Sequence, residues 1–327
     1  MPVHNGAAYI QEAALSLTRQ TFADWELVLV DDGSTDRSSE LAEEIIPASR
    51  LKIQRRERSA GVAESLNSAL ALATGPYIAR LDCDDVAHPD RLRWQYEVLR
   101  GDPNLTATFG WYRFIDYRGR PLPTNALTGP LSERGLDPTL LLGNPLCHPA
   151  ACFNQANGFP TEYPNHHYED YSLWLSSISN WHVFVDPRVA TYWRLHKGNQ
   201  SRTRVKEGNN QLTAVFVAAA ARQGFSIDVN VARAMLSPTN LSAPELINEA
   251  IATQRNIHQR ILSASEDAAC SIASRLQSSW ILRTMAQLDR KTLLRMLPQL
   301  TASEVSGLGS VALGAALRRV RLLDRRA

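Results

Sequence analysis

The sequence predicts an α/β protein, with a mostly parallel sheet flanked by helices and a helical C-terminal part. Two observations support this prediction. In the N-terminal part, short runs of β-forming residues alternate with segments in which apolar residues recur every three or four positions. Such alternation is typical of a parallel sheet covered by helices on both faces. From about Glu207 onward the strand signals stop, while the helical periodicity continues.

Each element of the N-terminal part has a local signal. Strands are expected where β-forming and apolar residues cluster, at 25–30, 51–53 and 77–81. Helices are expected after the Asn5-Gly6 turn, after the segment 31–36, after Gly61 and from Pro89. Proline suits the first turn of a helix because its missing N–H is not needed there. Gly75 is expected to end the helix that precedes the strand at 77–81.

Three carboxylates, Asp82, Asp84 and Asp85, directly follow the strand expected at 77–81. In open α/β sheets, ligands bind at the carboxyl ends of strands, which is where these acids fall. Carboxylates so close together repel one another unless a cation joins them, and Mg²⁺ and Mn²⁺ prefer oxygen ligands. If the strand continued, Asp82 and Asp84 would share one face, with Asp85 on the other. The sequence therefore predicts a divalent metal site; the alternative is an acidic turn that caps the next helix.

Length and composition narrow the class of protein. The 327 residues suffice for a large domain and a smaller one, which we place at 1–205 and 206–327. A formal net charge of +2 does not indicate a nucleic-acid partner. The scattered cysteines do not form a disulfide framework, and Cys147, His148 and Cys152 lack a second ligand pair at zinc spacing. No apolar run approaches the roughly 20 residues of a membrane span.

Seven short motifs occur along the chain, each of them weak by itself. They are Pro2 to Gly6, Gln20 to Phe22, Asp31 to Asp36, Gly61 with Asn67, Asp82 to Asp85 with Pro89 and Arg91, Glu169 to Trp174, and Tyr192 to His196. In this order and spacing they resemble the inverting glycosyltransferases of family 2, over the first two-thirds of the chain. The resemblance implies a GT-A fold, a Rossmann-like arrangement of helices around a mostly parallel sheet.

The start of the sequence departs from the family pattern. Members usually begin with an apolar strand that leads into the turn at Asn5, whereas this sequence starts at the turn itself. Without that strand, neighbouring strands would expose backbone edges and apolar faces. The first strand is therefore expected to be missing, and the native protein to begin upstream of Met1. The alternative is a truncated, inactive copy.

The resemblance implies a site for a nucleotide diphosphate sugar and a metal. The donor nucleotide would be held by Pro2, Asn5, Asp31, Asp32, Gly61, Asn67, Asp82 and Arg194. The ligands of Mg²⁺ or Mn²⁺ would be Asp84, Asp85 and His196. Taken alone, Asp31 and Asp32 would more simply complement a helix dipole, and a lone histidine is more often structural.

The resemblance also implies the catalytic and acceptor residues. Asp170 would be the general base and Glu169 its neighbour, since two adjacent carboxylates raise one pKa toward neutral pH. The alternative for this pair is helix capping. His148 and Trp111 are candidate acceptor contacts, Trp111 by stacking on a sugar face. Both residues are equally compatible with a place in the core.

The implied function is that of a hexosyltransferase in polysaccharide biosynthesis. It would move a sugar, with inversion, from a UDP-hexose or UDP-N-acetylhexosamine to a hydroxyl of a cell-surface glycan or lipid-linked glycan. One alternative is a truncated or inactive sugar-nucleotide-binding scaffold protein. A nucleotidyltransferase is disfavoured because the N-terminal part has no Gly-rich basic phosphate loop.

The last third carries no chemical motif. Helices are expected at 246–262, 268–288 and 303–323, in a subdomain that shapes the acceptor site, packs on the catalytic domain or forms a homodimer. The last helix interleaves arginines with apolar residues, and such a helix can lie on an anionic membrane surface. We therefore expect a cytoplasmic protein with peripheral contact at the inner face of the plasma membrane. The alternative is an ordinary solvated helix face.

Overall fold

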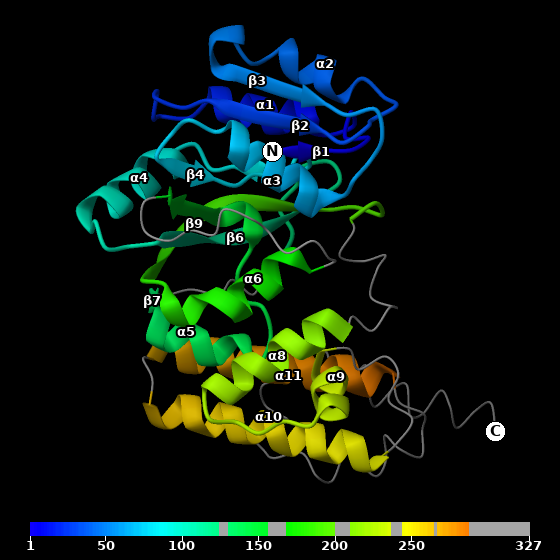
Figure 1. Cartoon of the computed structure of the whole chain (residues 1–327), viewed down its shortest axis with the longest axis vertical. Helices are drawn as coiled ribbons and strands as arrows, with labels where there is room; N and C mark the ends of the chain where they lie inside the picture. The colour runs from blue at the N-terminus through cyan, green and yellow to red at the C-terminus, as the bar shows by residue number, and fades with distance from the viewer. Residues whose placement is uncertain (124–129, 156–167, 200–209, 237–243, 265–266, 288–327) are drawn as a thin grey trace, which may run out of the picture. The chain divides into compact units, whose positions relative to one another are not determined.

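The computed structural model describes residues 1–123, 130–155, 168–199, 210–236, 244–264 and 267–287 (Figure 1). The chain forms two compact units. The first unit comprises 1–133 and 146–199, and the second comprises 134–145 and 200–327. Every residue that the sequence analysis assigned to the active site belongs to the first unit.

The first unit begins with a three-stranded parallel sheet in the order β1-β2-β3. Its strands are β1 (Pro2–Val3), β2 (Leu27–Asp31) and β3 (Leu51–Arg55). All five residues of β2 are buried. The strand expected to be missing is represented by two residues, since Pro2 pairs with Val30 and Val3 with Asp31. The carboxyl ends of β1 and β2 therefore lie together, and the candidate nucleotide residues follow them.

Three helices belong to this sheet, as the apolar spacing predicts. They are α1 (Ile10–Thr18), α2 (Ser38–Glu43) and α3 (Val62–Leu72). Ile10, Ala14 and Leu17 of α1 are buried in one core with Leu29 of β2. Gly75 does not end α3: the helix stops at Leu72, Ala73 is extended, and the Thr74 N–H donates to Glu26 Oε1 at 2.8 Å.

The second sheet of this unit has six strands. They are β4 (Tyr77–Ala79), β5 (Val86–Ala87), β6 (Ala107–Asp116), β7 (Leu131–Ser132), β8 (Ala151–Asn154) and β9 (Val183–Leu195). The order is β4-β8-β6-β9-β5, with β7 pairing β9. The long strands β6 and β9 run parallel, side by side (Figure 1), and the other pairs are antiparallel. The parallel sheet that the sequence predicts thus continues into a mixed one.

The strand expected at 77–81 is shorter and less buried than its apolar composition indicates. It ends at Ala79, and its residues are half-buried or exposed because β4 is an edge strand of the second sheet. The alternation that would place Asp82 and Asp84 on one strand face therefore does not apply. The three acids lie in the turn that joins β4 to β5.

Among the described residues of the first unit there are two further helices, α4 (Arg91–Gly101) and α6 (Glu169–Ser177), and three short 3-10 turns. The 3-10 turns are at Ala48–Arg50, His148–Ala150 and Ile178–Asn180. Trp94 of α4 packs against Ala190 of β9, and Trp174 of α6 makes an edge contact with Phe109 of β6. Phe109 and Gly110 are consecutive in β6, and Trp94 lies beside Gly110, so α4 and α6 cover opposite faces of the second sheet.

The described part of the second unit is helical, as predicted. Its helices are α5 (Glu133–Leu140, of which 134–140 belong here), α8 (Asn210–Arg222), α9 (Val229–Leu236), α10 (Pro244–Ala264) and α11 (Asp267–Gln287). Helix α10 packs against α9 and α11, and the Trp280 indole donates to the Met235 carbonyl at 2.8 Å. The helix expected at 303–323 lies outside the described residues. Among those described, no helix has the length and apolar character to cross a membrane.

Candidate active site

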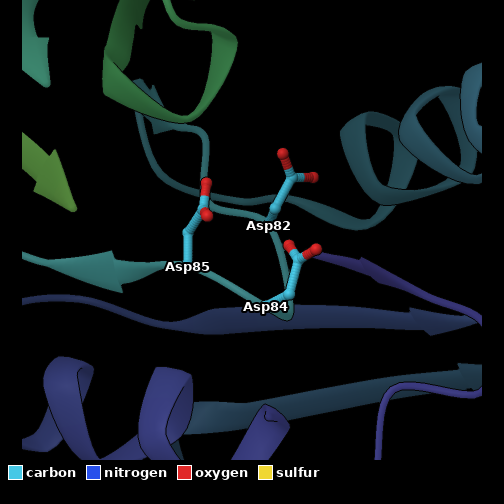
Figure 2. Close-up of side chains that lie close together, drawn as sticks. All are labelled: Asp82, Asp84 and Asp85. Carbon is cyan, nitrogen blue, oxygen red and sulfur yellow. The ribbon is translucent and has the colours of Figure 1, made fainter. Parts of the chain in front are cut away.

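The turn between β4 and β5 gathers three carboxylates, which we call the acidic turn (Asp82, Asp84 and Asp85). One carboxylate oxygen from each lies within 4.8 Å of the others, and Figure 2 shows the three side chains rising from the same short stretch of chain. Asp82 and Asp84 are half-buried, whereas Asp85 is 1% exposed. The first part of the predicted metal site is therefore assembled in the folded chain.

The environment of the acidic turn fits a divalent cation. Burial, and then the charges of Asp82 and Asp84, raise the pKa of Asp85 well above its usual value. Burial and the charge of Asp82 likewise raise the pKa of Asp84, although the His196 hydrogen bond opposes this. Asp85 Oδ1 accepts from the Arg194 backbone N–H at 2.9 Å. Its Oδ2 is buried and has no hydrogen-bond partner among the residues that the structure describes. Clustered, partly desolvated carboxylates with one unpartnered oxygen are the donor set that Mg²⁺ or Mn²⁺ takes.

His196 and Arg80 contact carboxylates of the acidic turn. His196 Nε2 lies 2.9 Å from Asp84 Oδ2, so the histidine assigned to the metal site is beside a predicted ligand. Arg80, which is 5% exposed, makes an ion pair with Asp82. Sequence reasoning passed over Arg80, although its position two residues before Asp82 was a usable signal. Arg80 places a positive charge at the edge of the acidic turn.

Glu169 and Asp170 form the first turn of α6 and are both half-buried. Tyr168, just before them, adopts a left-handed backbone (φ 73°), and Asp170 Oδ1 accepts from the Tyr171 N–H at 2.7 Å. Burial and the charge of Asp170 raise the pKa of Glu169 to about 8. Burial also raises the pKa of Asp170. The charge of Asp82 raises both values and Arg80 opposes it, so the acidic turn and the start of α6 share one electrostatic environment.

Asp32 fastens a loop at the carboxyl end of β2. Its carboxylate accepts hydrogen bonds from the N–H groups of Ala60 and Gly61, both at 2.9 Å, and from Ser59 Oγ at 2.6 Å. Burial alone would raise the pKa of Asp32, but these hydrogen bonds outweigh it and lower the value. Gly33 (φ +72°) lies so close that a Cβ there would meet the Arg58 and Ser59 backbone at 2.9 Å. Asp32 and Gly33 therefore hold the loop 58–61 against β2.

The remaining nucleotide candidates surround this loop or the adjacent turn. Asn5 has a positive φ of 53° and accepts from the Thr35 N–H at 2.9 Å. Asp31 Oδ1 accepts from the Ser34 N–H at 2.9 Å. Gly61, at the start of α3, has φ +97° with open space beside it. Pro2 is in β1, and Asn67 is half-buried on α3. These candidates thus gather around the ends of β1 and β2.

Arg194 and the two acceptor candidates are also buried. Arg194 is 1% exposed, and its guanidinium donates to Glu12, to the Asp84 carbonyl and to the Asp116 carbonyl. Trp111 is 2% exposed and His148 5% exposed. The His148 ring packs edge-on against Trp174, and burial lowers its pKa well below the usual value. In this conformation Arg194 supports the acidic turn, and Trp111 and His148 have the burial of core residues, the alternative that the sequence left open.

The two cavities described here lie away from the assigned site residues. Two open cavities of about 530 and 610 Å³ lie along α4, lined by residues such as Arg93, Arg188 and Phe184. None of the assigned site residues lines them. The acidic turn and α6 are therefore a better guide to the chemistry than the shape of the surface.

Comparisons with known proteins identify the family of the chain. The family model described as glycosyl transferase family 2 matches residues 1–156. An uncharacterized glycosyltransferase of Haemophilus influenzae is 30% identical over 209 residues, which cover 63% of this chain and 82% of that protein. The Escherichia coli protein WfgD, named a UDP-Glc:alpha-D-GlcNAc-diphosphoundecaprenol beta-1,3-glucosyltransferase, is 28% identical over 215 residues, covering 64% of this chain and 81% of WfgD.

Two solved structures have a similar fold. Staphylococcus aureus TarS 1-349, in complex with UDP-GlcNAc, has a TM-score of 0.58 and 18% identity, covering 91% of this chain and 90% of TarS. The mannosyltransferase PcManGT of Pyrobaculum calidifontis, in complex with GDP-Man and Mn²⁺, has a TM-score of 0.52 and 21% identity, covering 94% and 85%. At such identities these likenesses concern the fold alone.

Proposed function

Because the chain belongs to glycosyl transferase family 2 and has the GT-A fold, we propose that it is a metal-dependent, inverting hexosyltransferase. The donor is a nucleotide diphosphate sugar, and the acceptor is a hydroxyl of a cell-surface glycan. One observation carries the proposal: the acidic turn and the Glu169–Asp170 pair lie in one electrostatic environment. Metal ligands and a general base are the two groups of carboxylates that this reaction requires.

Asp84 and Asp85 are the proposed ligands of Mg²⁺ or Mn²⁺, with His196 beside them. The support is the clustering of the acids and the unpartnered Oδ2 of Asp85. A cation bound there supplies positive charge to a leaving diphosphate. Asp82, which is ion-paired with Arg80, is proposed to contact the donor ribose.

Asp170 is the proposed general base. It must be deprotonated to accept the proton of the acceptor hydroxyl, and burial brings its pKa upward. A base with a pKa nearer neutrality is more effective, because it both accepts the proton readily and is unprotonated at working pH. Glu169, whose pKa is about 8, remains mostly protonated at neutral pH and is proposed to contact the acceptor.

The donor nucleotide is proposed to lie at the carboxyl ends of β1 and β2. Open α/β sheets bind ligands at such an edge. Asn5 and Gly61 border it, and Asp31 and Asp32 fix the local backbone by accepting N–H donors. Asp32 therefore has two proposed functions, shaping the loop 58–61 and facing the nucleobase.

The names of the similar proteins support a UDP-hexose or UDP-N-acetylhexosamine donor. WfgD is named for UDP-Glc and TarS was solved with UDP-GlcNAc, whereas PcManGT was solved with GDP-Man. WfgD is also named for a sugar linked to diphosphoundecaprenol, which supports a lipid-linked acceptor. We extend the proposal to peripheral contact with the membrane that would carry such an acceptor.

A panel of nucleotide sugars, with Mn²⁺ or with EDTA, tests the proposal. Binding and slow hydrolysis are measured for the wild type, Asp84→Asn and Asp170→Asn. The control is Asp24→Asn, at an exposed carboxylate outside the site. We expect one nucleotide sugar to be bound and hydrolysed only with metal, Asp84→Asn to abolish both, and Asp24→Asn to behave as wild type. The proposal is overturned if the folded wild type neither binds nor hydrolyses any nucleotide sugar in either condition.

A further inference from the structure

Helix α1 provides Tyr9 at its N-cap and Glu12 in its first turn. Glu12 contacts Arg194, and Tyr9 contacts His196; both partners lie beside the acidic turn. We propose that Glu12 and Tyr9 are positioning residues, which hold Arg194 and His196 in place and thereby set the geometry of the metal ligands. This inference rests on the proposed metal site. It concerns two residues that belong to none of the motifs found in the sequence.

Strand pairing brings Arg194 to the acidic turn. In the antiparallel pair β5–β9, Val86 lies opposite Tyr192 and Ala87 opposite Thr191. The same register, continued by two residues, places Asp84 opposite Arg194. The contacts agree: the Arg194 N–H donates to Asp85 Oδ1 at 2.9 Å, and its Nε donates to the Asp84 carbonyl at 2.8 Å. Arg194 thus fixes the main chain at Asp84 and one carboxylate oxygen of Asp85.

Glu12 provides the charge that balances Arg194. Arg194 Nη2 lies 2.6 Å from Glu12 Oε2, and the side chain of Arg194 is 1% exposed, against 51% for that of Glu12. A buried guanidinium that loses its carboxylate partner is costly, because the remaining charge is neither hydrated nor paired. The orientation of Arg194, and with it the acidic turn, therefore depends on Glu12.

Tyr9 provides a surface on which both support residues pack. The Arg194 guanidinium carbon lies 5.1 Å from the centre of the Tyr9 ring. The rings of Tyr9 and His196 have centroids 4.6 Å apart. Since His196 Nε2 contacts Asp84 Oδ2, the Tyr9 ring limits where that imidazole can move. One aromatic ring therefore contacts the support residues of both Asp84 and Asp85.

A close-packed turn encloses Glu12 from the other side. Gly119 has φ +78°, and a Cβ at that position would lie 3.1 Å from Glu12 Oε1. Arg194 Nη1 donates to the Asp116 carbonyl at the start of the same turn, at 3.4 Å. The carboxylate of Glu12 thus contacts both Arg194 of β9 and the turn that follows β6. This is more than the chance pairing of two surface charges.

The matched control is Glu44 of a surface ion pair. Glu44 Oε1 lies 2.7 Å from Arg37, and its side chain is 52% exposed, close to the value for Glu12. Arg37 is itself exposed and has no link to the acidic turn. Glu12→Gln and Glu44→Gln therefore remove the same charge from pairs of similar length, and only the first pair supports the proposed ligands.

The experiment is a calorimetric titration of each folded variant with Mn²⁺ alone. We expect Glu12→Gln to weaken Mn²⁺ binding about tenfold, since loss of a residue that supports metal ligands typically costs 10- to 100-fold in affinity. Glu12→Asp is expected to lose less, and Glu44→Gln to bind as the wild type does. Tyr9→Ala should weaken binding more than Tyr9→Phe, which keeps the ring. Circular dichroism confirms folding, and Tyr9→Ala decides the question if Glu12→Gln does not fold.

The outcomes separate this inference from the proposed function. If the wild type binds Mn²⁺ and both Glu12→Gln and Tyr9→Ala bind it equally well, the positioning role is wrong and the metal site stands. If Glu44→Gln weakens binding as much as Glu12→Gln, the effect is one of net charge and the inference is again wrong. If the folded wild type binds no Mn²⁺, the metal-dependent function itself fails.

Discussion

Asp84 Oδ2 lies 2.9 Å from His196 Nε2, although 112 residues separate the two along the chain. This contact joins the acidic turn after β4 to the residue that follows β9. Burial and the charge of Asp82 raise the pKa of Asp84, and the hydrogen bond to His196 opposes part of this rise. Because the same carboxylate is a proposed metal ligand, His196 would lie beside a cation bound there.

Asp84→Asn is expected to abolish metal-dependent activity while the chain stays folded. The substitution keeps the size of the side chain but removes a charged ligand and the partner of His196. Loss of outer-shell groups alone costs 10- to 100-fold, so we expect at least a hundredfold weaker Mn²⁺ binding, measured by titration. Asp90→Asn, at an exposed residue past β5, serves as the control. Unchanged Mn²⁺ affinity in Asp84→Asn would show that Asp84 is not a ligand.

Asp170→Asn is expected to lower kcat with little effect on donor binding. An amide cannot accept the proton of the acceptor hydroxyl, and general base catalysis typically contributes about 10²- to 10⁴-fold. Glu169 lies next to it, but burial, the main cause of its raised pKa, remains in the variant and makes it a poor replacement. Steady-state kinetics and donor titration check this together. A variant that keeps its kcat, or loses kcat only through donor affinity, would exclude Asp170 as the base.

The pH dependence of the reaction is expected to follow the Glu169–Asp170 pair. Burial raises the pKa of both groups, and a base works only when deprotonated, so kcat/KM should rise with pH through the apparent pKa of the pair. Glu169 keeps its proton to about pH 8 and is therefore uncharged while Asp170 titrates, so Glu169→Gln is expected to leave this acidic limb nearly unchanged. The measurement is kcat/KM against pH for the wild type and Glu169→Gln, from pH 5 to about 9, and the pH of the acidic limb is compared between them. An acidic limb at an ordinary carboxyl pKa in the wild type would contradict the assignment.

Metal-free protein is expected to lose stability as pH rises. The pKa of Glu169 rises from 4.5 to about 8 on folding, so between those values the folded chain binds more protons than the unfolded one. Stability is then greatest below pH 4.5 for this group and falls as pH increases through 8. Burial of Asp85 acts in the same direction. Urea unfolding in EDTA at several pH values measures the slope, which Glu169→Gln should reduce.

Added Mn²⁺ is expected to offset this loss. A ligand that binds only the folded chain stabilises it by about 2.7 kcal/mol at a concentration of 100 times Kd. The gain should be larger at pH 8 than at pH 5, because ligand carboxylates must be deprotonated to bind the cation. Thermal unfolding with and without EDTA tests this. An equal Tm in both conditions at pH 8 would contradict a metal site in the acidic turn.

Local signals in the sequence predicted much of the fold, because periodicity and turn residues act over a few positions. Helix α1 was expected from Ile10, Ala14 and Leu17, and the structure has all three in its core. The edge position of β4 was not predictable, since its apolar composition resembles that of a central strand. Whether a strand is buried depends on neighbours far along the chain.

In the candidate site, too, local features were predictable from the sequence and long-range contacts were not. The Asp82 to Asp85 cluster was visible because its members adjoin one another. The Arg194–Glu12 pair joins residues 182 positions apart, and no local pattern marks Glu12 as its partner. Trp111 has the chemistry of a sugar-stacking residue, but its burial depends on the whole unit. The sequence thus marked acids that adjoin one another, but not the distant residue that contacts Arg194.

Gly33→Ala is expected to loosen the loop 58–61 and weaken donor binding. Gly33 has φ +72°, a conformation that costs a non-glycine residue about 1–3 kcal/mol. The added methyl would also meet the Arg58 carbonyl carbon and the Ser59 nitrogen at 2.9 Å, and neither backbone atom can rotate away. The loop must then move off β2 and give up its hydrogen bonds to Asp32.

Gly101→Ala is the control for Gly33→Ala, since a Cβ there meets nothing within 4 Å. We measure urea unfolding and UDP affinity for both variants. Loss of UDP affinity in Gly33→Ala alone supports a donor site at this loop, whereas unchanged affinity in a destabilised variant would place the nucleotide elsewhere.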